Sequence, residues 1–238
     1  MPYFLADTNI RINKPFILSG DEANHIVLSK RAKIGERVKI QGPNGKRFIC
    51  EILEAKKHRV ELKPLEETAV PAEPAVKIVL FQSVVAQASL DLIFQKSVEL
   101  GAGEVVLFNS ANTATRLTRE KFEEKSTRRN KILWEAAKQC ERARIPELRF
   151  LNNLDDVIQF AKDLGKVFLM DIEGQRLEMI GKGFIAVGFL VGPEGGLTEE
   201  EIDKIKKLPN CRAVTLGPIL LKAETVAIAG LAIISNLI

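Results

Sequence analysis

Residues 184–196, Phe-Ile-Ala-Val-Gly-Phe-Leu-Val-Gly-Pro-Glu-Gly-Gly, join an unbroken apolar run to a glycine-rich loop. An apolar run of this length is typical of a strand that is covered on both faces of a sheet. Thr198 then stands three residues before Glu201, which is the capping-box spacing at the start of a helix. The segment therefore predicts a buried strand, a tight loop and a helix in direct succession.

A second segment repeats this arrangement nearer the carboxyl terminus. Residues 212–216 predict a strand, Gly217-Pro-Ile-Leu-Leu-Lys222 follows it, and an apolar helix is expected from about Ala223. Open α/β sheets bind ligands at the carboxyl ends of their strands, where glycine lets the backbone approach a ligand closely. Two such loops favour a ligand site, although each alone is also compatible with a tight strand-to-helix turn. Neither contains the G-x-G-x-x-G or G-x-x-x-x-G-K-[ST] nucleotide motif.

Upstream of these loops, strand and helix patterns alternate from residue 76 onward. Strands are predicted over 76–81, 104–108 and 166–170, and helices over 90–100, 126–142 and 155–164. This alternation is typical of an α/β domain with a mostly parallel sheet.

Residues 1–63 differ, because short strand patterns alternate there with turns. The strongest turn signal is Gly42-Pro-Asn-Gly45. Strands are predicted over 37–41, 47–54 and 59–63, with a short helix over 21–30. Residues 64–74 are proline-rich and lack periodicity, so we expect a linker there. The expected domains are therefore residues 1–70, a small β-barrel, and residues 76–238, an α/β domain.

The net charge of +4 is unevenly distributed along the 238 residues. Residues 113–149 hold 11 basic and 6 acidic side chains, and most basic positions of the helix predicted over 126–142 lie off its apolar face. Such a basic stripe attracts polyanions, including nucleic-acid phosphates. A solvated helix face is the alternative.

The composition argues against several classes of protein. Two histidines, His25 and His58, and three separated cysteines argue against a zinc site, and the histidines lie far from the glycine loops, which disfavours a Ser-His-Asp hydrolase. No apolar run reaches the roughly 20 residues of a membrane span, and the first residues lack a signal-peptide pattern. We expect a cytoplasmic protein with reduced cysteines, no metal and no membrane association.

Four blocks together carry a family resemblance. They are Val191-Gly-Pro-Glu-Gly-Gly-Leu197, Leu216-Gly-Pro-Ile-Leu-Leu-Lys-Ala-Glu-Thr225, Gln95-Lys-Ser-Val-Glu-Leu-Gly101 and Gln139-Cys-Glu-Arg-Ala-Arg-Ile-Pro-Glu147. In this order they resemble the RsmE-type 16S rRNA (uracil-N3) methyltransferases of the SPOUT class. His25 and Arg31 match the amino-terminal part of the same family.

The resemblance implies a fold, a cofactor and partners. The fold is a PUA-like, RNA-binding β-barrel followed by a SPOUT-type parallel sheet with a carboxyl-terminal trefoil knot, in a homodimer. S-adenosylmethionine would bind in the knot, mainly to backbone groups of three loops. The residues thereby expected to bind it are Leu169, Met170, Val191, Gly192, Pro193, Glu194, Gly195, Gly196, Leu216, Gly217, Pro218, Leu220 and Leu221.

The implied reaction is methylation of uridine N3 in 16S rRNA of the small ribosomal subunit. Because N3–H is a poor nucleophile near neutral pH, the site must favour loss of its proton, and a nearby cation would stabilise the resulting anion. Lys222 is the expected cation, and Glu224 is a second catalytic candidate. Alternatively, Glu224 is a carboxylate at a helix N-terminus that interacts favourably with the helix dipole. The residues expected to contact RNA are His25, Arg31, Lys96, Arg116, Arg142 and Arg144.

The sequence departs from the family pattern mainly at basic positions. Ile219 stands where the family has arginine, so a cation is missing there. Lys222 also replaces an arginine; it keeps the positive charge but lacks the planar guanidinium group that donates two parallel hydrogen bonds. The other departures are Ala86 and Ser89 for basic residues, Ser110-Ala-Asn112 for Ser-Glu-Arg, Glu141 for glycine and Ala223 for threonine. Two further hypotheses follow: a non-catalytic RNA-binding relative, and a related methyltransferase that acts on a ribose 2′-OH or on another RNA.

Overall fold

The computed structural model describes residues 3–29, 32–177 and 183–238. The chain forms two compact units, which we call the amino-terminal unit (residues 1–72 and 137–144) and the carboxyl-terminal unit (residues 73–136 and 145–238). Residues 137–144 thus group with the amino-terminal residues, which no sequence pattern indicates.

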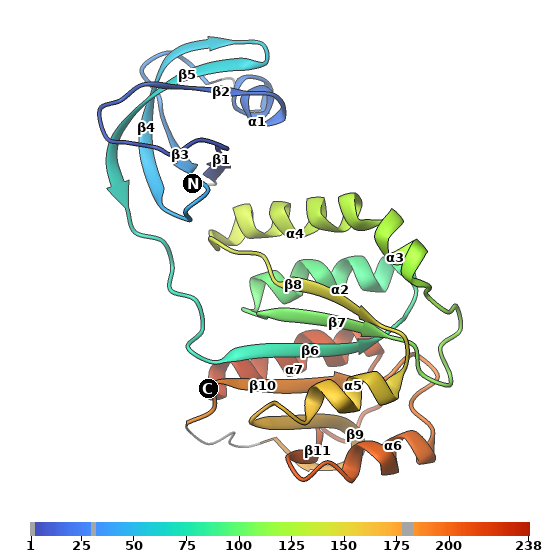
Figure 1. The fold of residues 1–238 in the computed structure, drawn as a ribbon. Helices are drawn as coiled ribbons and strands as arrows, with labels where there is room; N and C mark the ends of the chain where they lie inside the picture. Colours follow the sequence, from blue (N-terminus) through green and yellow to red (C-terminus); the bar gives the residue numbers. More distant parts are fainter. Residues whose placement is uncertain (1–2, 30–31, 178–182) are drawn as a thin grey trace. The chain divides into compact units, whose positions relative to one another are not determined.

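The amino-terminal unit is a five-stranded sheet that curls into a half-barrel, the PUA-like architecture expected (Figure 1). The strand order is β1-β3-β4-β5-β2, and all neighbours except the parallel pair β1 and β3 are antiparallel. The elements are β1 (Tyr3–Leu5), β2 (Phe16–Ser19), α1 (Asp21–Asn24), η1 (His25–Ser29), β3 (Arg37–Gln41), β4 (Arg47–Lys56) and β5 (Arg59–Thr68). Buried Phe4, Ile26, Ile40 and Leu62 contribute to its core.

The linker predicted over residues 64–74 is wrong in its first part, because β5 continues to Thr68. Pro64 pairs with Cys50 where the register between β4 and β5 shifts. A proline cannot donate a hydrogen bond and is tolerated in a strand at such an irregularity. The proline therefore marks a bulge in the strand rather than its end.

Residues 137–144 are anchored in the amino-terminal unit mainly by charged and polar side chains. Glu141 has a φ of 60°, and both its carboxylate oxygens accept hydrogen bonds of 2.9 Å from Lys39 Nζ. Arg47 Nη1 lies 3.6 Å from the same carboxylate. The buried guanidinium of Arg47 also stacks on the Tyr3 ring, 3.9 Å from the ring centre. The hydrogen bond from Lys39 is the largest influence that lowers the pKa of Glu141, to about 2.

The carboxyl-terminal unit contains a six-stranded sheet in the order β11-β9-β10-β6-β7-β8, with every neighbouring pair parallel. Its strands are β6 (Lys77–Ser83), β7 (Glu104–Phe108), β8 (Glu147–Leu151), β9 (Lys166–Arg176), β10 (Ala186–Val191) and β11 (Cys211–Thr215). The helices are α2 (Gln87–Glu99), α3 (Arg119–Glu124), α4 (Ser126–Cys140), α5 (Leu154–Ala161), α6 (Glu199–Lys206) and α7 (Ala223–Leu237). The predicted α/β class is confirmed. Edge strand β8 was not predicted, because it is half exposed and lacks an apolar run.

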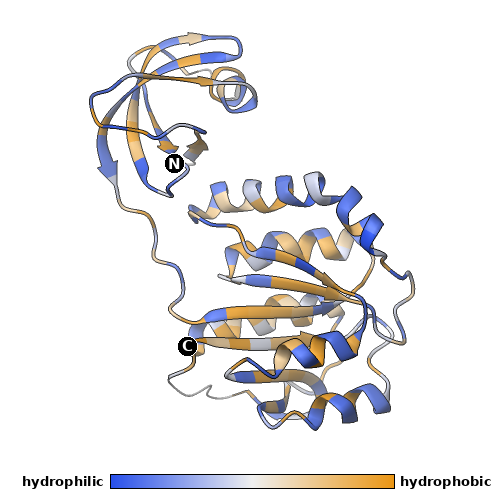
Figure 2. Ribbon diagram, viewed as in Figure 1, coloured by the Kyte–Doolittle hydropathy of each residue, from blue (hydrophilic) through white to orange (hydrophobic). Residues whose placement is uncertain are grey.

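Helices cover both faces of this sheet (Figure 1). Val79 and Phe81 of β6 share one cluster with α5 and α6, whereas α7 packs against α2, β6 and β10 on the other face. A Cβ at Gly230 of α7 would lie 2.0 Å from the Phe189 ring of β10, so glycine permits this close approach. Figure 2 shows the central strands mainly in hydrophobic colours, as burial on both faces requires.

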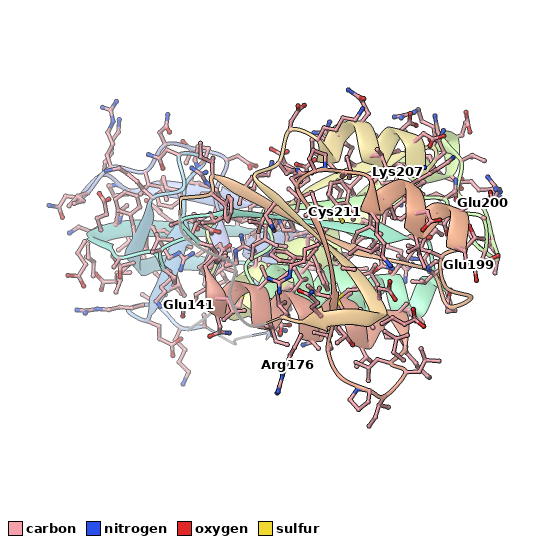
Figure 3. All side chains as sticks on the ribbon, turned by 90° about the horizontal axis from the view of Figure 1, so that it is seen from below. Glu141, Arg176, Glu199, Glu200, Lys207 and Cys211 are labelled. Carbon is pink, nitrogen blue, oxygen red and sulfur yellow. The ribbon has the colours of Figure 1, made fainter. Side chains whose placement is uncertain are left out.

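The capping box predicted at Thr198 and Glu201 is present at the start of α6. Figure 3 shows Glu199 and Glu200 at this end of the helix and Lys207 at the other. Carboxylates near a helix N-terminus and cations near its C-terminus both interact favourably with the helix dipole. The local sequence therefore fixes where α6 begins, directly after the glycine loop.

Helix α7 is the apolar final helix that the sequence predicts, beginning at Ala223. Within the described ranges, no helix combines the length and apolarity that crossing a membrane requires. The trefoil knot that the resemblance implies for this part of the chain stays a prediction.

Candidate functional site

A cavity of about 740 Å³ lies where β10 and β11 end, beside the middle of β9. Its wall is built mainly from residues 170–172, 191–197 and 215–224, which follow or interrupt these three strands. This volume lies within the usual range of small-molecule sites, roughly 300–1,000 Å³. The structure thus brings the two glycine-rich segments to one site. We call residues 192–196 the first glycine loop and residues 217–222 the second glycine loop.

Two glycines give these loops conformations that other residues adopt with strain. Gly196 has a φ of 72° and Gly217 a φ of 132°, and a Cβ added at either would meet no atom within 4 Å. Both residues line the cavity. The backbone here is exposed to a space that a ligand can occupy, without a side chain in between.

The third segment reaches the cavity because β9 bulges. Ala213 of β11 pairs with Leu169, but the next residue, Val214, pairs with Gln175, so residues 170–174 lie outside the ladder. A Cβ at Gly174 would lie 2.5 Å from the Val214 backbone nitrogen, so glycine is required where the strands come back together. The bulge places Met170, Asp171 and Ile172 in the cavity wall.

Asp171 is the carboxylate of this bulge that lines the cavity. Its side chain is mostly buried, and its Oδ2 lies 2.8 Å from Lys206 Nζ of α6. Burial tends to raise the pKa of Asp171, but hydrogen bonds from Lys206 and from the Glu173 backbone N–H outweigh it and lower the pKa. The hydrogen bond to Asp171 raises the pKa of Lys206. Asp171 therefore stays ionised at neutral pH.

The first glycine loop is connected to neighbouring elements on two sides. Glu194 Oε1 accepts a hydrogen bond of 2.9 Å from the backbone N–H of Ala86, the N-cap residue of α2, which has no side-chain cap of its own. Asn112 Nδ2 donates to the carbonyl oxygens of Gly195 and Gly196, at 3.3 and 3.1 Å. From the sequence, Asn112 is only a departure from the family pattern and is not among the expected site residues. A polar run directly after strand β7 was the signal that could have found it.

Apolar and charged groups share the remainder of the wall. Ile219 and Leu220 of the second glycine loop line the cavity and are 75% and 84% exposed, so they present apolar surface to it. Lys222 is exposed and precedes α7, and half-buried Glu224 lies in the first turn of that helix. Both line the cavity, so the structure places the two predicted catalytic residues beside the predicted cofactor loops.

Two of the residues predicted to bind a cofactor do not line the cavity. Leu169 is fully buried in β9, and Pro218 is absent from the cavity wall among the residues that the structure describes. The predicted residues that do line it are Met170, Val191, Gly192, Pro193, Glu194, Gly195, Gly196, Leu216, Gly217, Leu220 and Leu221.

The residues predicted to contact RNA lie in both units. The amino-terminal unit holds exposed His25, whose ring makes an edge contact with Phe4, together with Arg142 and Arg144. Lys96 and exposed Arg116 belong to the carboxyl-terminal unit, where Lys96 forms an ion pair with Glu99. Arg31 lies outside the described residues.

Several cations of the basic helix α4 make contacts within the protein. Arg128 pairs with Asp91, and Lys138 pairs with Glu22. Arg129 is buried with its guanidinium 4.1 Å from the centre of the Phe122 ring, and this burial lowers its pKa. Arg129 and Lys138 therefore serve packing within the protein, and only Arg128 of the three is exposed.

A metal centre finds no support in the described part of the chain, where no group of three or more His, Cys, Asp and Glu side chains could hold an ion. A cavity lined by two glycine loops, apolar side chains, one lysine and three carboxylates, beside a parallel sheet, is typical of the sites where α/β enzymes bind small molecules.

Comparison with known proteins identifies the class and then the family. A family model described as an RNA methyltransferase domain matches residues 72–235, and one described as an RNA methyltransferase PUA domain matches residues 18–65. The chain is therefore an RNA methyltransferase. It belongs to the RsmE family, whose curated members match nearly its full length.

Curated relatives and solved structures agree with this assignment. The ribosomal RNA small subunit methyltransferase E of Bacillus subtilis is 28% identical, over 98% of this chain and 95% of its own length. The protein of the same name from Mesomycoplasma hyopneumoniae is 30% identical, over 90% of each chain. A crystal structure of ribosomal RNA small subunit methyltransferase E from Neisseria gonorrhoeae bound to S-adenosylmethionine has a TM-score of 0.87. It is 26% identical and covers 100% of this chain and 98% of its own.

Proposed function

We propose that this protein transfers a methyl group from S-adenosylmethionine to N3 of a uridine in 16S rRNA of the small ribosomal subunit. The observation that carries the proposal is the single cavity that unites the two glycine loops and Lys222. The names of the full-length relatives support ribosomal RNA of the small subunit as the substrate. The motifs at residues 191–197 and 216–225 support the uridine N3 position.

The cavity fits S-adenosylmethionine in size and chemistry. Gly196 and Gly217 leave open space in the cavity where a side chain would otherwise stand, so an adenine ring can approach the loop backbone, and Leu220 and Leu221 offer apolar contact to its faces. The relative from Neisseria gonorrhoeae was crystallised with this molecule. When bound, S-adenosylmethionine supplies an electrophilic methyl group on its sulfonium.

The side chains of the cavity supply the remaining requirements. The ammonium group of Lys222 lowers the free energy of the negative charge that develops on uracil when N3–H loses its proton. Glu224 is the proposed hydrogen-bond acceptor for that N3–H. Exposed Ile219 and Leu220 exclude water from the reacting atoms once RNA covers them.

The two parts of the chain have different main roles in this proposal, and both contribute RNA contacts. Residues 1–70 form the RNA-binding domain and residues 76–238 the methyltransferase domain. His25, Arg31, Lys96, Arg116, Arg142 and Arg144 contact the RNA in this proposal. The protein acts in the cytoplasm as a homodimer, to which the apolar helix α7 contributes contacts.

Calorimetry with S-adenosylmethionine, followed by methyl transfer to assembled small subunits and to naked RNA, tests the proposal. We expect micromolar binding and one methylated uridine, located by mass spectrometry of nuclease fragments. Methylation of a ribose 2′-OH would overturn the N3 assignment. Salt-dependent RNA binding without methyl transfer would identify a non-catalytic relative.

A further inference from the structure

The turn after β7 is a rigid part of the carboxyl-terminal unit. The backbone N–H of Ser110 donates to Thr113 Oγ1 at 2.9 Å, and the Thr113 N–H donates back to the Ser110 carbonyl oxygen at 3.2 Å. Buried Ser83 of β6 bonds to both hydroxyls, at 2.7 and 3.2 Å. The closed hydroxyl cluster fixes the conformation of residues 110–113, which we call the 110–113 turn.

The 110–113 turn is also connected to the capping box of α6. Glu201 Oε1 accepts a hydrogen bond of 2.8 Å from the Ala111 backbone N–H, while its Oε2 accepts one of 3.0 Å from the Thr198 N–H. The side chain of Glu201 is buried, so both bonds are shielded from water. The start of α6 and the 110–113 turn therefore form one connected support.

Asn112 extends from this support to the first glycine loop. Its Nδ2 donates to the carbonyl oxygens of Gly195 and Gly196, and a Cβ at Gly195 would lie 3.2 Å from the Asn112 Cβ. The two carbonyls belong to the peptide groups on either side of Gly196, which has a φ of 72° and lines the cavity. The Asn112 side chain thus holds the backbone on both sides of Gly196, the residue of this loop with a positive φ.

We propose that Asn112 is a positioning residue, which holds the first glycine loop in its ligand-binding conformation and so determines affinity for the methyl donor. This inference rests on the proposed function. It assigns a role to a residue that differs from the arginine of the resembled family. The preorganised loop loses less conformational freedom when a ligand binds, so binding is tighter.

The test compares Asn112→Asp and Asn112→Ala with the unmodified protein. Asn112→Asp keeps the side-chain shape and removes the donor, and Asn112→Ala removes both. Because both variants lose the hydrogen bonds from Nδ2, we expect them to bind S-adenosylmethionine about five- to tenfold more weakly, which corresponds to roughly 1.0–1.4 kcal/mol. The KM for the methyl donor should rise by the same factor, while kcat at saturation changes less than twofold. If added charge alone mattered, Asn112→Asp would instead bind the cationic donor more tightly.

Asn210→Asp is the matched control. Asn210 Nδ2 also donates to two carbonyl oxygens, those of Ala161 and Leu164, but Asn210 does not belong to the described cavity wall. We expect this variant to lower the melting temperature without changing affinity for the donor. Unchanged affinity in both Asn112 variants, or equal losses in Asn210→Asp, would overturn the proposal.

Hydrogen exchange separates this inference from the proposed function. Without any ligand, the amides of residues 195–197 should exchange faster in both Asn112 variants and at the original rate in Asn210→Asp. If the unmodified protein does not bind S-adenosylmethionine, the proposed function fails, and these exchange rates still decide whether Asn112 holds the loop. Unchanged exchange in the Asn112 variants contradicts the inference.

Discussion

Glu141 in the amino-terminal unit and Gly196 and Gly217 in the carboxyl-terminal unit all adopt positive φ angles, but they are held there by different means. Glu141, at 60°, carries a side chain whose carboxylate pairs with Lys39 and lies beside buried Arg47. The two glycines, at 72° and 132°, have no side chain and face open space. The positive φ of Glu141 is stabilised by ion pairs, whereas the two glycines adopt a positive φ without a steric penalty because they have no Cβ.

The difference shows what each region can tolerate. A backbone stabilised by ion pairs depends on each charged partner, because removing one leaves the others uncompensated. A cavity formed by glycine backbone depends on the absence of side chains at those positions. Substitutions in the ion-paired region around Glu141 or in the glycine-lined cavity test this difference, and the region left unchanged serves as the reference.

The largest effect is expected for Gly217→Val. A β-branched residue at a φ of 132° is strained, and its side chain would enter the cavity. We expect affinity for S-adenosylmethionine to fall at least about 100-fold, which corresponds to roughly 2.7 kcal/mol, measured by calorimetry. Gly183→Val is the control, because Gly183 also has a positive φ, 93°, and lies outside the described cavity wall. Equal loss of binding in both variants would contradict the assignment of the cavity.

Lys222→Met should have the next largest effect, on catalysis rather than binding. Removing one group that stabilises a developing anion typically lowers kcat about 100-fold or more. We expect a decrease of about 100-fold in single-turnover methylation, with donor affinity changed less than threefold, and partial recovery in Lys222→Arg. A kcat equal to that of the unmodified protein would exclude Lys222 from the reaction.

Glu141→Gln perturbs the charge-stabilised region. Breaking a fully buried ion pair costs about 3–5 kcal/mol, and partial exposure of Glu141 reduces this, so we expect a loss of about 2 kcal/mol in unfolding free energy. Urea denaturation measures it. Glu67→Gln, which removes the exposed pair between Lys46 and Glu67, should cost less than about 0.5 kcal/mol. A drop in donor affinity in Glu141→Gln would show that the two regions are not independent.

The smallest expected effect is a change with pH in the difference in unfolding free energy between the unmodified protein and Glu141→Gln. The pKa of Glu141 falls from 4.5 to about 2 on folding, so its contribution to stability is complete above pH 4.5 and is lost as pH falls toward 2. The stability gap between the unmodified protein and Glu141→Gln should therefore be constant from pH 7 to 5 and narrower at pH 3.5. Urea titrations at these three pH values measure the gap. A gap independent of pH would exclude the ionised carboxylate as its source.

Sequence patterns predicted the local elements around the site well. Strand β7, the capping box of α6 and the start of α7 lie where the sequence places them, because each depends on residues close together in the chain. The family blocks also led to both glycine loops, which line one cavity. The edge strand β8 and the continuation of β5 through Pro64 lacked such a local signal.

Only the tertiary structure revealed how the site is supported. The contacts of Asn112 with Gly195, of Asp171 with Lys206 and of Glu141 with Lys39 join residues that are 35 or more positions apart. Such contacts depend on which strands become neighbours and on their register, and no periodicity or capping rule encodes them. The amino-acid sequence by itself determined the class of the fold and the identity of the loops. The packing of distant segments decided which side chains hold those loops and which cations remain at the surface.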